Sequence, residues 1–150
     1  MYSKLLLNSR GDTLFISTKG RYGLYFMTVL ADNYNSCKRS VKSVAIERGI
    51  SDLYLEQIVA KLKKANLVKS TRGAHGGYEL SMPPEDISVY MIFKAVEENI
   101  LVIEQDEKDT KNEKYLWREM RDAMSGVMKN TTLYDLITSP DEIEEYMFYI

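Results

Sequence analysis

Residues 40–80 read SVKSVAIERGISDLYLEQIVAKLKKANLVKSTRGAHGGYEL, and they contain the clearest signals of secondary structure in the chain. Within it, Ser40 can cap a short helix over residues 41–48 that ends at a glycine, and Ser51 can cap a longer helix over residues 52–65. The longer helix carries apolar side chains at the spacing of one buried stripe, namely Leu55, Ile58, Val59 and Leu62. A short helix, a glycine-containing turn and a capped longer helix are typical of a helix-turn-helix.

A predicted β-hairpin follows the longer helix directly. Residues 67–71 form the first expected strand, residues 78–80 form the returning strand, and the glycine-rich residues 72–77 form the turn between them. A hairpin directly after the second helix of a helix-turn-helix is a wing. The pattern therefore predicts a winged helix-turn-helix domain over residues 14–84.

Two further helices are predicted on either side of this unit. Ser17-Thr18 can cap a helix over residues 19–32, which is so apolar that most of its faces must be buried. After two prolines, Asp86 or Ser88 can cap a helix over residues 89–97. The fold class that we expect is mainly α, with a small β-hairpin wing and a long C-terminal dimerisation helix.

The dimerisation helix is predicted from an apolar stripe in the second half of the chain. Residues 104–114 are nearly all polar and are interpreted as a flexible linker, so that residues 85–130 hold a linker helix and the dimerisation helix. The winged domain has a core of its own, so we expect the stripe to meet its equivalent in a second chain. Its members are Leu116, Trp117, Met120, Ala123, Met124, Val127 and Met128.

Charge divides the chain into two halves. Residues 15–82 carry 11 Lys and Arg against 5 Asp and Glu, a balance of +6, whereas residues 83–150 carry 7 against 16, a balance of −9. A basic first half suits contact with phosphate, and an acidic second half suits solvent or protein.

Sequence-specific contacts are expected from the start of the 52–65 helix, because those residues of a recognition helix reach base edges in the major groove. Gln57 can bind adenine through two hydrogen bonds, and Glu56 can accept one from cytosine. The alternative is that both belong to a solvated helix face. The full predicted set is Ser51, Asp52, Leu53, Tyr54, Glu56 and Gln57.

Contacts to the DNA backbone are expected from cations and from the wing. Arg72 lies where the hairpin enters its tip, next to Gly73, and is the candidate for the minor groove; His75 in the same turn can contact phosphate or solvent. Each lysine or arginine is alternatively a plain surface charge. The cations expected to neutralise phosphates are Lys19, Arg21, Lys42, Lys63, Lys64 and Lys69.

Other classes of protein find little support. Cys37 is the only cysteine and His75 the only histidine, so we expect no intrachain disulfide, metal site or cofactor, and a reducing cytoplasm is the simplest location. The sequence shows no nucleophile–base pair that would point to an enzyme. The apolar start of the chain is too short for an export signal or a membrane span. Beside Lys38, Cys37 is either a redox-sensitive thiol or an inert loop residue.

The motifs at residues 16–24 (ISTKGRYGL), 54–57 (YLEQ) and 72–80 (RGAHGGYEL) resemble those of the Rrf2 family of bacterial winged-helix regulators. The resemblance spans about residues 14–150 and implies a dimeric repressor on a pseudo-palindromic operator in double-stranded DNA. Residues 1–13 lie outside it, and we expect them to be a non-native leader before a start at Leu14.

Some members of this family hold an iron–sulfur cluster on three cysteines between the fourth helix and the dimerisation helix. Residues 100–114 contain none, so the resemblance is to the branch without a cluster, which represses genes of sulfur uptake and cysteine synthesis together with O-acetylserine thiol-lyase. Residues 131–150 are expected to form a C-terminal segment whose tail binds that enzyme. Alternatively the tail packs on its own dimer; it comprises Tyr146, Met147, Phe148, Tyr149 and Ile150.

Two rival functions remain at this point. A winged helix can serve protein assembly alone, without binding DNA, although the positive charge of residues 15–82 argues against this. The chain can also be a regulator that senses a small molecule in a pocket between the winged domain and the dimerisation helix.

Overall fold

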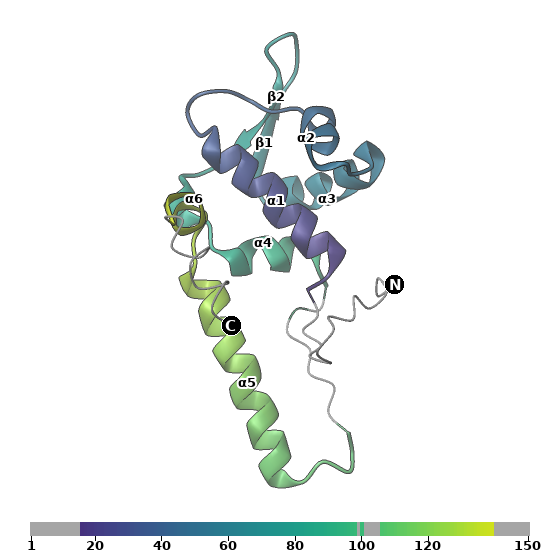
Figure 1. The fold of residues 1–150 in the computed structure, drawn as a ribbon, viewed down its shortest axis with the longest axis vertical. Helices are drawn as coiled ribbons and strands as arrows, with labels where there is room; N and C mark the ends of the chain where they lie inside the picture. The colour runs from purple at the N-terminus through teal and green to yellow at the C-terminus, as the bar shows by residue number, and fades with distance from the viewer. Residues whose placement is uncertain (1–15, 99, 101–105, 140–150) are drawn as a thin grey trace, which may run out of the picture.

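The computed structural model describes residues 16–98, 100 and 106–139. The expectations for the leader over residues 1–13 and for the tail over residues 146–150 lie outside these residues. The described elements are, in chain order, α1 (Thr18–Asp32), α2 (Val41–Arg48), α3 (Asp52–Lys64), β1 (Val68–Thr71), β2 (Gly77–Leu80), the 3-10 helix η1 (Pro84–Asp86), α4 (Val89–Val96), α5 (Lys111–Asn130) and α6 (Leu133–Thr138). The wing projects from one end of the packed helices, and α5 extends from the opposite end (Figure 1).

Serine caps fix the starts of the first four α-helices, as predicted. The Ser17 hydroxyl accepts a hydrogen bond from the Gly20 amide at 2.9 Å, and the Ser40 hydroxyl accepts one from the Ser43 amide at 3.1 Å. Gly49 ends α2 in the left-handed conformation, with φ of 68°. The structure therefore confirms the helix-turn-helix that the serine caps and Gly49 predicted.

The wing is anchored by a contact that the sequence did not indicate. Strands β1 and β2 pair antiparallel, and β2 also bridges to the segment before α2, where the Arg39 amide donates to the Tyr78 carbonyl at 3.0 Å and the Tyr78 amide donates to the Arg39 carbonyl at 2.8 Å. Gly77 has φ of 140°, and a Cβ there would lie 3.0 Å from the Arg39 carbonyl oxygen. Only glycine fits this junction without strain.

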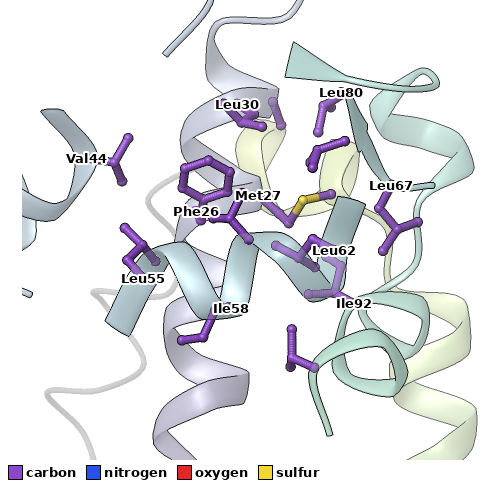
Figure 2. Close-up of a cluster of buried hydrophobic side chains, with 14 of the residues drawn as sticks. Phe26, Met27, Leu30, Val44, Leu55, Ile58, Leu62, Leu67, Leu80 and Ile92 are labelled. Atoms are coloured by element: carbon purple, nitrogen blue, oxygen red, sulfur yellow. The ribbon is translucent and has the colours of Figure 1, made fainter. Parts of the chain in front are cut away.

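The core lies between α1, α3 and α4, and Figure 2 shows its side chains converging from these helices and from the wing. Phe26, Met27 and Leu55 are fully buried within it. Side chains after residue 84 belong to the same core, namely Ile87, Ile92, Val96 and Leu133. The packing therefore extends beyond the 14–84 boundary and includes the short helix α6.

Two glycines let α1 approach α4 closely. A Cβ at Gly20 would lie 2.5 Å from Cε1 of Phe93, and one at Gly23 would lie 3.2 Å from Cγ1 of Val96. The two glycines of the 16–24 motif are thus explained by the close packing of α1 on α4.

The linker prediction is wrong at its end, because residues 111–114 belong to α5. The Thr110 hydroxyl accepts from the Glu113 amide at 3.3 Å, and the Glu113 carboxylate accepts from the Thr110 amide at 2.6 Å, which forms a capping box. The hydrogen bond from the Thr110 amide, together with a smaller contribution from the Thr110 side chain, holds the pKa of the Glu113 carboxyl below its usual range. Helix α5 runs for 20 residues, and none of them is buried.

Among the described residues, no helix combines the length and apolarity needed to cross a membrane.

Candidate DNA-binding surface

Helix α3 presents a continuous exposed face opposite its buried stripe. Leu53, Gln57, Ala60 and Lys64 are all exposed and follow one another at helical spacing, i, i+4, i+7 and i+11. They define the midline of the face, because the buried Leu55, Ile58, Val59 and Leu62 lie on the other side. Glu56 is exposed beside this midline. The predicted base readers Leu53, Glu56 and Gln57 are therefore together on one surface.

The start of α3 positions this face. The Ser51 hydroxyl caps the helix by accepting from the Tyr54 amide at 3.3 Å, and the Asp52 carboxylate accepts from the Leu53 amide at 2.9 Å. Both side chains are exposed at the N-terminus of α3, which is the end that contacts base edges when a recognition helix lies in the major groove. Their hydrogen bonds to the backbone fix the end of the helix.

Tyr54, which the sequence grouped with the base readers, points elsewhere. It is half-buried and packs edge-on against Tyr22 of α1, with ring centroids 5.9 Å apart. Burial raises the pKa of the Tyr54 phenol, and the nearby Glu97 carboxylate adds to the rise. Tyr54 therefore packs α3 against α1 through its ring, and this packing role was not evident from the sequence.

The wing brings Arg72, Gly73 and His75 to an exposed tip. Gly73 has φ of 108°, which the sharp turn requires. The strands below the tip are tied to α3 and to each other, since Lys63 Nζ donates to the Ser70 hydroxyl at 2.7 Å and Lys69 Nζ lies 3.4 Å from the Glu79 carboxylate. Lys63 and Lys69 thus have partners within the chain.

The other predicted phosphate contacts come from separate elements. Lys42 is exposed in the first turn of α2, and Lys64 is exposed at the end of α3. Lys19 and Arg21 are exposed in the first turn of α1, at the other end of the winged domain from the wing tip (Figure 1). In the part of the chain that the structure describes, none of these four forms an ion pair within 4 Å.

Cys37 lies in the loop before α2 and is exposed. Its thiol donates to Oδ1 of Asn33 at 3.1 Å. Arg39, two residues further on, forms an ion pair with Glu47. Within the described ranges, no three His, Cys, Asp or Glu side chains form a group that could hold a metal ion.

The apolar stripe of α5 divides into two rows. Trp117, Met124 and Met128 are half-buried and lie on one side of the helix. The other four members are exposed and follow a 4-3-4 spacing, which is the pattern of a helix–helix seam: Leu116, Met120, Ala123 and Val127. We refer to these four residues as the α5 seam.

These features define a class of protein: a winged helix-turn-helix with an exposed recognition helix and a basic wing. The family model "Rrf2: Iron-dependent Transcriptional regulator" matches residues 16–139. The chain belongs to the Rrf2 family, as the motifs predicted, and it is accordingly a transcriptional regulator and not an enzyme.

Similar proteins agree with this assignment. The HTH-type transcriptional regulator CymR of Bacillus subtilis (strain 168) is 46% identical over 138 residues, which cover 90% of this chain and 99% of that protein. The solved structure of B. subtilis CymR, described as the global cysteine regulator, has a TM-score of 0.79 at 43% identity and covers 86% of this chain and 100% of that chain. The oxidized form of Staphylococcus aureus CymR has a TM-score of 0.76 at 46% identity and covers 83% and 97%.

The iron named in the family description does not fit this chain. A cluster held by cysteines needs several thiolates, and the sequence contains a single cysteine, Cys37. Cys37 lies in the loop before α2, where its thiol donates a hydrogen bond to Asn33. The donor set for the cluster that the family implies is therefore missing.

Proposed function

We propose that this protein is a dimeric repressor of genes for sulfur and cysteine metabolism, which binds a pseudo-palindromic operator in the bacterial cytoplasm. The observation that carries the proposal is the exposed face of α3 next to a glycine-turned wing with an exposed Arg72. A helix with one free face and a basic loop beside it suit simultaneous contact with the major groove and a neighbouring minor groove.

The α5 seam supports the dimer. Val127 at one end is 68% exposed and Met120 in the middle is 47% exposed, so both side chains lose a large contact with water when a second copy covers them. Two symmetry-related α3 helices then enter successive major grooves, and the half-site centres lie about one helical turn, roughly 34 Å, apart. Tight binding of a monomer to a single half-site would contradict this arrangement.

The regulated genes are inferred from similarity. B. subtilis CymR is described as a global cysteine regulator, and it is similar to this chain over nearly its whole length. Because the chain lacks the cysteines for an iron–sulfur cluster, the metabolic signal can instead reach it through a protein partner. We therefore propose O-acetylserine thiol-lyase as the co-regulator that conveys the metabolite state.

Arg72→Ala is expected to weaken binding to the operator by about 1–3 kcal/mol and to relax specificity near the wing contact. Lys64→Ala is the matched comparison, because it removes an exposed cation from the end of α3. It should weaken all DNA sequences alike and reduce the salt slope by about one. Titrations of both variants at several salt concentrations measure this, and unchanged operator affinity in Arg72→Ala would refute the wing contact.

Deletion of residues 148–150 is expected to abolish binding to O-acetylserine thiol-lyase while the dimer and its DNA contacts persist. The removed residues, Phe148, Tyr149 and Ile150, are aromatic or aliphatic. Their burial in an enzyme pocket is worth about 1.5–3 kcal/mol per large side chain before ordering costs, so three side chains reach the roughly 8 kcal/mol of micromolar binding only at the upper end of this range. Calorimetry with the enzyme and ultracentrifugation of the same truncated protein separate this from the alternative: unchanged enzyme affinity with a weakened dimer means that the tail braces its own dimer.

A further inference from the structure

Leu53 is an apolar side chain near the start of the exposed face of α3. It is the second residue of the helix, it is 65% exposed, and it lies on the midline opposite the buried stripe. It contributes nothing to the core, which α3 supplies with Leu55, Ile58, Val59 and Leu62. Its methyl groups are therefore available for contact with DNA that binds this face of α3.

The major groove offers one apolar group on its base edges, the C5-methyl of thymine. A leucine side chain can bury that methyl, whereas it cannot satisfy the hydrogen-bonding groups of the other bases. We propose that Leu53 reads a thymine methyl in each half-site of the operator. The inference rests on the proposed function and specifies one base that the recognition helix selects.

Gln57 fixes where that thymine lies. It follows Leu53 by one helical turn on the same midline, a rise of about 6 Å along the axis, and base pairs are about 3.4 Å apart. If the Gln57 amide binds adenine, the thymine read by Leu53 lies one or two base steps from it. An adenine contact by Gln57 would thus place an adenine and a thymine at this short spacing in the half-site.

The experiment uses the full-length protein and an operator selected from random DNA duplexes. Each thymine of the selected operator is replaced in turn by deoxyuridine, which removes only the methyl group. One position in each half-site should then cost about four-fold in affinity, and about fifteen-fold when both half-sites are changed. In Leu53→Ala the loss at that position should disappear, and in Leu53→Met, which keeps an apolar contact, it should remain.

Ile46→Ala is the matched control. Ile46 is likewise aliphatic and 71% exposed, but it lies on α2, outside the recognition helix. This variant should keep the full penalty for deoxyuridine. Leu53 and Ile46 lie outside the core, so unfolding midpoints of all variants should match that of the unchanged protein.

The outcomes distinguish the role of Leu53 from the proposed function. An operator whose affinity is insensitive to every thymine methyl overturns the role of Leu53 and leaves the proposed function standing. That role is also overturned if Leu53→Ala keeps the penalty, since another side chain then contacts the methyl. Failure to select any preferred sequence overturns both the proposed function and this inference.

Discussion

Met120→Glu is expected to make the protein monomeric and to lower its affinity for a complete operator by about 100-fold or more. Met120 is exposed in the middle of the α5 seam. In a two-fold dimer the substitution brings two carboxylates into an apolar contact, where their desolvation and mutual repulsion both oppose association. A monomer then loses the gain that comes from linking two half-site contacts, which reaches factors of about 10²–10⁴.

Lys114→Glu is the control for this variant. It introduces the same side chain in the same helix, at an exposed position on the side away from the seam. Sedimentation equilibrium and operator titration of both variants provide the measurement. The assignment of the seam fails if Met120→Glu remains a dimer, or if Lys114→Glu dissociates to the same extent.

The parts of the fold that the sequence predicted well are those with local signals. Ser40, Gly49 and Ser51 each act within their own helix ends, and the glycine-rich turn at 72–77 acts within its own hairpin. These signals depend on neighbours a few residues away, so a single sequence contains them in full. The recognition face follows as well, because the stripe that is buried determines which side is exposed.

Contacts between distant segments were not predictable in the same way. The bridge from Arg39 to Tyr78 and the packing of Tyr54 on Tyr22 join segments that no periodicity connects. The start of α5 differs, because Thr110 and Glu113 form a local capping box that the polar composition of the region obscured. A polar run is thus a weak argument for a linker when it contains a helix-start signature.

The attachment of α6 to the core is a long-range contact with a large expected effect on stability. Leu133 is fully buried, and its amide donates to the Ile87 carbonyl at 2.9 Å. The Val89 amide donates to the Thr131 carbonyl at 2.9 Å, so the end of α5 and the start of α4 are joined as well. These two hydrogen bonds lie next to the contact that the buried Leu133 side chain makes with the core.

Leu133→Ala is expected to destabilise the protein by about 2–5 kcal/mol, because truncation of a buried leucine removes apolar contacts and leaves a cavity. This is a large share of the roughly 5–15 kcal/mol that stabilises a typical domain. Leu136→Ala is the matched control, since Leu136 lies in the same helix but is 38% exposed and outside the core, so its loss should change stability by about 0.5 kcal/mol or less. Urea unfolding at one protein concentration compares the two variants. Equal stability of Leu133→Ala and the unchanged protein would mean that the core does not depend on α6. A large loss means that a helix beyond α5 completes the core of the winged domain, which fixes α5 to that domain.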